Sequence, residues 1–364
     1  MTVRSTARLA DGRELFYYDQ ASGADRSAPD RRTDLPEAET SSEVRWNPLF
    51  HDYAVIADHR QSRTYRPPAK LCPLCPSRDG NLTEIPADDY EVAVFENRFP
   101  SFALKAAATV PLVDMPPFRS GPGDGRCEVV CFSSRHDDSF AGLPAERVRT
   151  VIDAWADRTE ALSAIDSIDY VFCFENRGEE IGVTLTHPHG QIYGYPFVPP
   201  RFFTVAHALR RYRERTGRCL QCDLLGHELE AGTRVVAESA QWVVYVPFAA
   251  RWPYEVRVVP RAHVTDLPAL DAAARDDLAA VYLDVLIRFD RLFGDSGTPY
   301  IAGWQQAPAR QDRDVWHLAA EIFTIRRAPG RLKYLAGSES GAGVWVNDVA
   351  PEVAAARLRE ARIS

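Results

Sequence analysis

The amino-acid sequence predicts an α+β protein built from two tandem copies of one unit, each with a largely antiparallel sheet and a packing helix. The first copy begins after Leu71 with CPLC, passes through strand-like segments and a helical run over residues 144–164, and ends at HPHGQIYGYPF. The second begins with CLQC, contains a long amphipathic run over residues 271–292, and ends at VWHLAAEIFTI. Agreement of successive elements in one order indicates a duplication.

The chain before the first copy predicts an arm. Residues 21–42 are polar and rich in Pro, Asp and Ser, a composition typical of loops. We therefore expect a flexible arm over residues 1–42, one half over residues 43–200 and a second half over residues 201–364. Regular structure should resume at EVRWNPLFHDYAVIADHR, where the alternating pattern indicates a strand.

Composition narrows the class of protein. The 364 residues are 45% hydrophobic and 26% charged, which suits a globular enzyme, and the net charge of −8 argues against nucleic acid as the main partner. No apolar run is long enough to span a membrane, and the first residues lack the apolar core of a signal peptide. A cytoplasmic enzyme without a membrane or nucleic-acid partner is the expectation.

Four of the seven cysteines form two CxxC pairs, and each pair is followed by two histidines, which are separated by 51 positions in the first copy and 54 in the second. The predicted ligand sets are Cys72, Cys75, His136 and His187, and Cys219, Cys222, His263 and His317. Two thiolates and two imidazoles complete the tetrahedral shell of Zn²⁺, so each set predicts a structural zinc site. The alternative is that the thiols are free and the histidines are ordinary loop residues.

Within HPHGQ, the polar residues His187, His189 and Gln191 stand at every second position. A strand sends alternate side chains to one face, so we expect all three on one surface. With His187 assigned to metal, His189 and Gln191 are left for chemistry.

These motifs resemble those of the galactose-1-phosphate uridylyltransferases, a branch of the histidine-triad superfamily. HPHGQ is similar to their active-site motif, and the resemblance covers about residues 43–348 through CPLC, FENRF, CFSSRH, FENRG, WPYEVRVVPRAHV and KYLAGSE. It implies two histidine-triad-like units whose sheet forms a half-barrel. The first would be catalytic. The second would lack the nucleophile, because Ala319 and Glu321 stand where the first has His189 and Gln191.

The resemblance implies ping-pong transfer of a uridylyl group from UDP-glucose to galactose 1-phosphate, with His189 as the nucleophile that carries it. A neutral imidazole is a competent nucleophile near pH 7 when its other ring nitrogen keeps its proton on an acceptor. Gln191 can donate a hydrogen bond to a phosphate oxygen but cannot deliver a proton, which favours transfer over hydrolysis.

The resemblance also implies substrate contacts. Arg60 and Arg63 would reach phosphates, Asn97 and Asn176 the nucleotide, Gly182 and Thr184 the phosphate loop, and Lys333 and Glu339 the hexose 1-phosphate, some of these from the partner subunit of a homodimer. Alone, each arginine would be interpreted as a solvated charge.

The chain also departs from the family pattern. The iron ligands of many relatives are replaced by Val205, Gln305, Ala319 and Glu321, so zinc but no iron is expected. Arg98 replaces an aspartate beside the ribose, and Ser338 replaces a tyrosine beside the sugar. Another sugar 1-phosphate or base, a dinucleoside-polyphosphate phosphorylase, and an inactive zinc or nucleotide-binding module are the alternatives.

Overall fold

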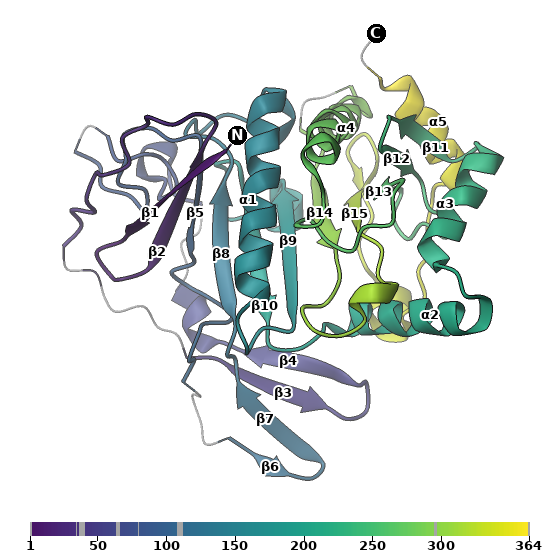
Figure 1. The fold of residues 1–364 in the computed structure, drawn as a ribbon, viewed down its shortest axis with the longest axis horizontal. Coiled ribbons are helices and arrows are strands. Elements are labelled where there is room, and N and C mark those ends of the chain that lie inside the picture. Colours follow the sequence, from purple (N-terminus) through teal and green to yellow (C-terminus); the bar gives the residue numbers. More distant parts are fainter. Residues whose placement is uncertain are drawn as a thin grey trace.

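The structure is a computed structural model that describes residues 2–33, 35, 41–62, 66–78, 80–107, 112–294 and 297–362. Its main feature is an eleven-stranded, entirely antiparallel sheet with the order β1-β2-β5-β8-β10-β9-β14-β15-β13-β12-β11 (Figure 1). Its strands are β1 (Val3–Arg8), β2 (Glu14–Asp19), β5 (Val92–Glu96), β8 (Arg126–Cys131), β9 (Tyr170–Arg177), β10 (His189–Tyr195), β11 (Val235–Glu238), β12 (Trp242–Tyr245), β13 (Tyr254–Pro260), β14 (Tyr300–Gln305) and β15 (Ala319–Thr324).

The strand order repeats about the central pair, β9 and β14. From β9 outward the first half runs β9-β10-β8-β5, and from β14 outward the second half runs β14-β15-β13-β12. The predicted α+β duplication is therefore confirmed. Because β9 and β14 are hydrogen-bonded to each other, the two halves share one sheet.

Two long helices, α1 (Ala145–Ser163) and α4 (Ala272–Arg291), lie side by side on one face of the sheet (Figure 1). Each lies within one residue of its predicted range at both ends. The side chain of Asp271 caps α4 by accepting a hydrogen bond from the Ala274 amide at 2.7 Å. Both helices bury apolar side chains, including Trp155 and Tyr282, in one core that spans the two halves.

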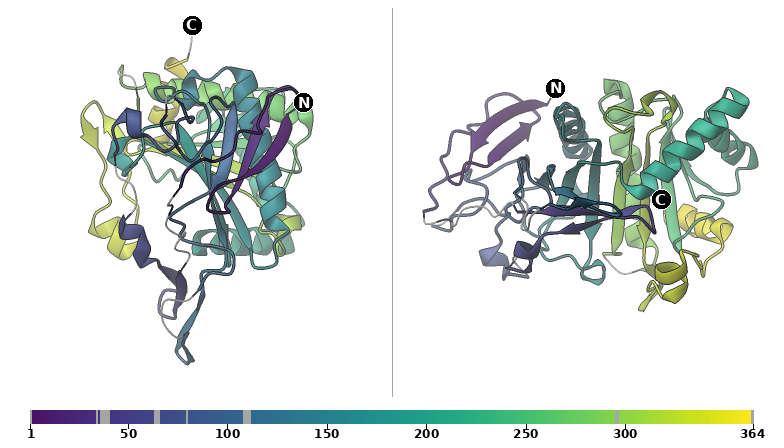
Figure 2. Two further views of the ribbon diagram at one scale, coloured as in Figure 1. Left: turned by 90° about the vertical axis from the view of Figure 1, so that its left-hand side faces the viewer. Right: turned by 90° about the horizontal axis from the view of Figure 1, so that it is seen from below.

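Further helices surround the second half: α2 (Pro200–Thr216), α3 (Leu220–Ala231) and α5 (Pro351–Glu360). A small sheet of order β4-β3-β7-β6 projects from the body (Figure 2). Its strands are β3 (Glu43–Asn47), β4 (Asp52–Ile56), β6 (Asp114–Met115) and β7 (Phe118–Pro122). A hairpin of β16 (Arg326–Ala328) and β17 (Arg331–Leu332) and short helical turns at Asp58–Ser62, Ala69–Leu71, Phe140–Gly142, Glu179–Ile181, Arg313–Val315 and Gly337–Gly341 complete the described elements.

The expectation of a flexible N-terminal arm over residues 1–42 is wrong for its first part, which forms two strands. β1 and β2 extend the large sheet at β5, because Phe16, Tyr17 and Tyr18 are buried there. The part of the following loop that is described packs on this edge, where the Arg26 side chain donates to the Asp19 carboxylate. Only residues 34 and 36–40 of this loop lie outside the described residues.

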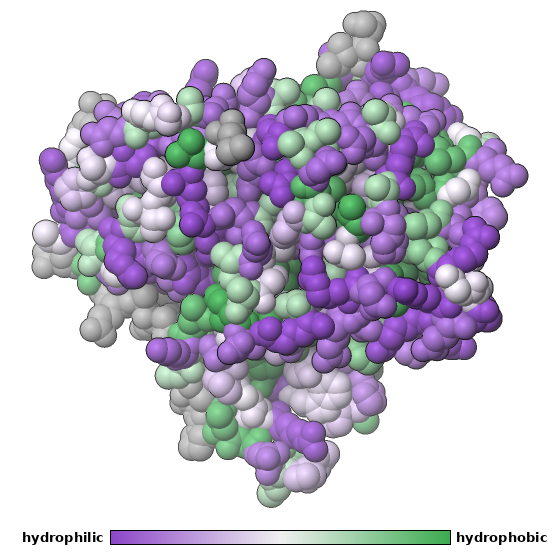
Figure 3. Space-filling model, viewed as in Figure 1, coloured by the Kyte–Doolittle hydropathy of each residue, from purple (hydrophilic) through white to green (hydrophobic). Residues whose placement is uncertain are grey.

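The molecular face shown in Figure 3 is mainly hydrophilic, with apolar residues gathered where the small sheet joins the body. Among the described residues, no helix has both the length and the apolar character that a membrane crossing requires.

Candidate active site

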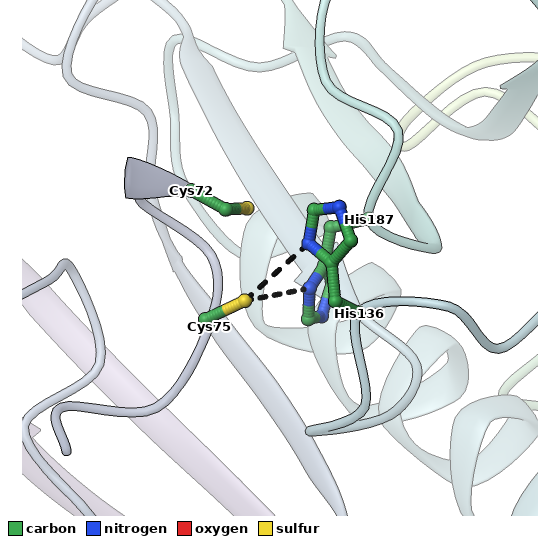
Figure 4. A group of neighbouring side chains, drawn as sticks. All are labelled: Cys72, Cys75, His136 and His187. Atoms are coloured by element: carbon green, nitrogen blue, oxygen red, sulfur yellow. Dashed lines mark hydrogen bonds between the residues drawn. The ribbon is translucent and has the colours of Figure 1, made fainter. Parts of the chain in front are cut away.

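The first predicted ligand set forms a compact group. Cys72, Cys75, His136 and His187 place their ligand atoms within 4.8 Å of one another. The Cys75 sulfur lies 3.4 Å from Nδ1 of His136 and 3.5 Å from Nδ1 of His187 (Figure 4). Two sulfur atoms and two imidazole nitrogens that point at one another can hold a metal ion such as Zn²⁺.

The far ring nitrogen of His187 fixes the orientation of its imidazole. Nε2 lies 2.7 Å from the carbonyl oxygen of Ser133, to which it can donate, so that Nδ1 presents a lone pair to the cysteines. His187 is buried, and this burial lowers its pKa to about 4. A neutral imidazole is the form that binds a metal.

The second predicted set is also brought together. Cys219, Cys222, His263 and His317 again place their ligand atoms within 4.8 Å of one another. Nε2 of His317 lies 3.0 Å from the carbonyl oxygen of Pro260, which corresponds to the 2.7 Å contact of His187 with Ser133. This CxxC pair lies at the start of a helix: Cys219 is the N-cap residue of α3, and Cys222 is within its first turn.

His189 is the first residue of β10, and its ring is half-buried. Its Nδ1 lies 2.7 Å from the carbonyl oxygen of His187. Donation of the Nδ1 proton to this oxygen leaves the lone pair on Nε2, and burial lowers the pKa of His189. His189 thus holds a neutral imidazole whose orientation is set by the backbone of His187, a member of the first Cys₂His₂ group.

Gly190, between His189 and Gln191, is required by packing. A Cβ atom there would lie 2.7 Å from the ring of Phe132 and 2.9 Å from the carbonyl oxygen of Phe174. Only glycine lets β10 approach its neighbours this closely while the residues on either side point the other way.

Gln191 belongs to a row of side chains that crosses four strands. Phe95, Val129, Gln191 and Phe174 are successive partners on β5, β8, β10 and β9. All four line a cavity of about 350 Å³ that also contains His189. It lies on the face opposite α1 and α4, because the alternate residues of these strands pack in the core beneath the helices.

Most of the predicted substrate residues line this cavity. They are Arg60, Asn97, Asn176, Gly182 and Thr184. The Arg60 guanidinium donates to the carbonyl oxygen of Phe99 at 2.7 Å, which holds it at the cavity wall. Arg63 lies outside the described residues.

Lys333 and Glu339 are not part of the cavity wall. They form an ion pair with each other at 2.7 Å, and this contact lowers the pKa of Glu339 to about 2.

Sequence reasoning missed one charged residue of the cavity, Glu84. It follows the first CxxC pair and resembles any surface glutamate in the sequence, since no motif marks it. Only the fold shows that Glu84 is buried and paired with two arginines.

In the second half, the residues equivalent to His189 and Gln191 do not face an open cavity but are buried or hydrogen-bonded to other side chains. β15 begins at Ala319 as β10 begins at His189, and Glu321 occupies the position of Gln191. Glu321 accepts hydrogen bonds from Arg201 at 2.7 Å and from the amide of Gln305 at 2.8 Å. Gln305 and Glu321 are two of the four positions that the family resemblance links to an iron site; of the other two, Val205 packs in an apolar cluster and Ala319 is buried.

Comparison with known proteins identifies the family of this chain. The model of the N-terminal domain of galactose-1-phosphate uridyl transferase matches residues 32–199, and that of the C-terminal domain matches residues 206–363. The chain belongs to this family. Its relatives are galactose-1-phosphate uridylyltransferases, so the chain is an enzyme of the nucleotidyltransferase class.

Individual relatives agree. Galactose-1-phosphate uridylyltransferase of Streptomyces lividans is 46% identical and the alignment covers 98% of this chain and 97% of that one. The enzyme of the same name from Thermotoga maritima is 37% identical, over 88% of this chain and 99% of its own. A solved uridylyltransferase structure is 31% identical, with a TM-score of 0.78 and coverage of 88% and 98%.

Proposed function

We propose that this enzyme transfers a uridylyl group from UDP-glucose to galactose 1-phosphate by a ping-pong reaction through His189. The observation that carries the proposal is the 2.7 Å contact between Nδ1 of His189 and the His187 carbonyl oxygen, which leaves Nε2 free at the cavity floor. The family membership and the names of the relatives support the choice of substrates.

In the first step, Nε2 of His189 bonds to the α-phosphorus of UDP-glucose. The bond from this phosphorus to the bridging oxygen breaks, and glucose 1-phosphate leaves with the electron pair. In the second step, a phosphate oxygen of galactose 1-phosphate attacks the uridylyl-histidine, which releases UDP-galactose and restores His189. No proton has to be delivered, because a sugar phosphate is a stable anion.

Gln191 and the arginine at the cavity wall support these steps. The Gln191 amide faces the same cavity as His189 and can donate to a non-bridging phosphate oxygen as charge develops. Arg60 adds a permanent cation for the phosphates, and the loop with Gly182 and Thr184 forms the facing wall.

We propose that each Cys₂His₂ group holds one zinc ion and that the enzyme contains no iron. The donor atoms fit Zn²⁺, and a backbone carbonyl orients one histidine of each group. When bound, zinc would supply a rigid closed anchor; the protein's own role is that the first group holds His187, whose carbonyl oxygen orients His189.

We propose a homodimer in which the segment around Lys333 and Glu339 reaches the partner's cavity. These two residues lie outside their own cavity, and the apolar side chains of Tyr334, Val344 and Val346 near them are exposed. Exposed apolar groups around a polar pair suit a subunit interface.

Incubation with UDP-glucose labelled with ³²P at the α-phosphate tests the mechanism. We expect acid-labile, base-stable label on His189 and release of glucose 1-phosphate before any acceptor is added. His189→Gly should lower exchange by about 10⁴-fold or more, since no other imidazole or thiol is among the described residues that line the cavity. His227→Ala, at a histidine with 79% exposure on α3, is the matched control and should keep full activity.

The outcome also separates the alternatives. Label on another residue contradicts the mechanism, and no label in active buffer supports an inactive nucleotide-binding module. Label that transfers to other sugar 1-phosphates in preference to galactose 1-phosphate identifies a different acceptor.

A further inference from the structure

A single carboxylate is found among the described residues that line the His189 cavity, and it belongs to Glu84. Glu84 is 6% exposed, so it is part of the wall and not of the surface. A buried negative charge is unfavourable beside phosphates. It must therefore face a part of the ligand that offers hydrogen-bond donors.

Two arginines of the N-terminal segment hold this carboxylate. Arg13 donates to its Oε2, and Arg32 lies 2.9 Å from its Oε1. Asp11 and Asp30 pair with these arginines at 2.7 Å each, which fixes their guanidinium groups. These contacts orient the side chain of Glu84 before any ligand binds.

The carboxylate keeps hydrogen-bonding capacity. Each of its oxygens has two acceptor positions, and the two arginines occupy one on each oxygen. Arg98, whose guanidinium is 3.8 Å away, is beyond hydrogen-bond distance. One acceptor position per oxygen is available to a donor in the cavity.

The surroundings of Glu84 fit a flat, largely apolar group. Pro73, Leu74, Phe95 and Val129 line the cavity with it. The Glu84 amide donates to the Pro73 carbonyl oxygen at 3.0 Å, so Glu84 is fixed to the loop of the first metal group. Phe95 lies two strands from Gln191 in the cross-strand row, a separation of about 10 Å. This apolar end is therefore placed to take the base of a nucleotide whose phosphate is at Gln191.

We propose that Glu84 is the specificity-determining residue for the nucleobase, accepting a hydrogen bond from a base with a protonated ring nitrogen. Uracil and guanine carry such an N–H. Adenine and cytosine present a lone pair at the corresponding nitrogen, which the carboxylate repels. This inference rests on the proposed function, because it requires a nucleotide bound at His189. Arg32 is a positioning residue that acts through Glu84.

The test measures ³²P labelling of the full-length enzyme from α-labelled UDP-, GDP-, ADP- and CDP-glucose. We expect kcat/KM for labelling from UDP-glucose to exceed that from ADP- and CDP-glucose by about 100-fold or more, because a wrong base leaves buried polar groups unpaired. Glu84→Gln offers both a donor and an acceptor, so this ratio should fall to about tenfold or less. The loss should be mainly in KM for UDP-glucose, since His189 is unchanged.

Arg32→Met and Arg26→Met form a matched pair. Both arginines come from the same segment and pair with a buried aspartate, but only Arg32 contacts Glu84. We expect Arg32→Met to lower the base ratio and Arg26→Met to leave it unchanged, and this pair decides the question should Glu84→Gln fail to fold.

The possible failures are distinguishable. Labelling from no sugar nucleotide contradicts the proposed function itself. Normal labelling from UDP-glucose, with the same base ratio in the wild type and in folded Glu84→Gln and Arg32→Met, contradicts only the role of Glu84.

Discussion

Each half of the large sheet has a row of four paired residues on neighbouring strands, but the side chains in the two rows differ. In the first half the row is Phe95, Val129, Gln191 and Phe174, and it lines an open cavity. In the second half the equivalent partners on β12, β13, β15 and β14 are Tyr245, Arg257, Glu321 and Gly303. There, hydrogen bonds between protein groups take up the polar atoms that a ligand would otherwise meet.

The row of the second half, called the closed row here, is part of a connected hydrogen-bond network. Gln305 accepts from Arg257 and donates to Glu321, at 2.8 Å in both cases, and Arg201 at the start of α2 pairs with Glu321. Both halves nevertheless keep a Cys₂His₂ group in which one histidine is oriented by a backbone carbonyl. The two halves thus share the Cys₂His₂ group and the strand order. They differ in the residues at the first and third positions of β10 and β15.

Among the variants that test this comparison of the two halves, an exchange of the residue at the third position of β10 should have the largest effect. Gln191→Glu places a second anion where phosphate binds and removes the donated hydrogen bond. We expect kcat/KM for uridylyl exchange to fall by about 10²–10³-fold, the range found when one such donor is lost. Steady-state exchange kinetics with circular dichroism as a folding check measure this.

Glu321→Gln is the reciprocal variant and serves as the control. It removes the partner of Arg201, whose side chain is 45% exposed and can turn to water. The melting temperature should fall by a few degrees while exchange stays within about twofold. A loss of exchange equal to that of Gln191→Glu would show that the second half takes part in the reaction.

Much of this comparison could be predicted from the sequence. The duplicated order of elements predicts the sheet and two helices over residues 144–164 and 271–292, and these helices are found at 145–163 and 272–291. A long segment with helical periodicity of its apolar residues is the strongest local signal. The two ligand sets follow from spacing. The polar composition of residues 21–42 led to the wrong expectation for the strands before it, although ELFYY reads as a buried strand.

Other features depend on tertiary contacts. The role of Glu84 is invisible until β1, β2 and their following loop fold back and bring Arg13 and Arg32 to it. In the same way, no local signal shows that Arg201 closes the second row, because the pairing joins residues 120 positions apart. Helix α2 was not predicted, although the sequence carries signals for its two ends: Pro200 in the first turn and Gly217 at the C-terminal end.

The two metal groups should differ in their effect on activity. We expect about two zinc ions and little iron per wild-type chain by elemental analysis, and about one zinc in either Cys75→Ser or Cys222→Ser. Cys75→Ser loosens the group that holds His187, so exchange should fall by about 10–100-fold. Cys222 lies in the half whose cross-strand row is occupied by hydrogen bonds between protein groups, so Cys222→Ser should keep exchange within a few-fold. Equal losses in the two variants, or one zinc in the wild type, would contradict this division.

The smallest effect concerns pH and the closed row. Burial raises the pKa of Glu255 from its ordinary 4.5 to about 7, and the neighbouring Glu321 carboxylate adds to the rise. A raised pKa in the folded state means that Glu255 contributes stability below pH 4.5 that is lost as the pH rises through 7. Glu255→Gln keeps an acceptor for the Arg251 amide without the charge, so its melting temperature relative to wild type should rise by about 2 °C between pH 5 and pH 8. Calorimetry at intermediate pH values measures this, with the exposed Glu230→Gln as the control. A difference that stays constant or shrinks with rising pH would show that the second row tolerates the buried charge without cost.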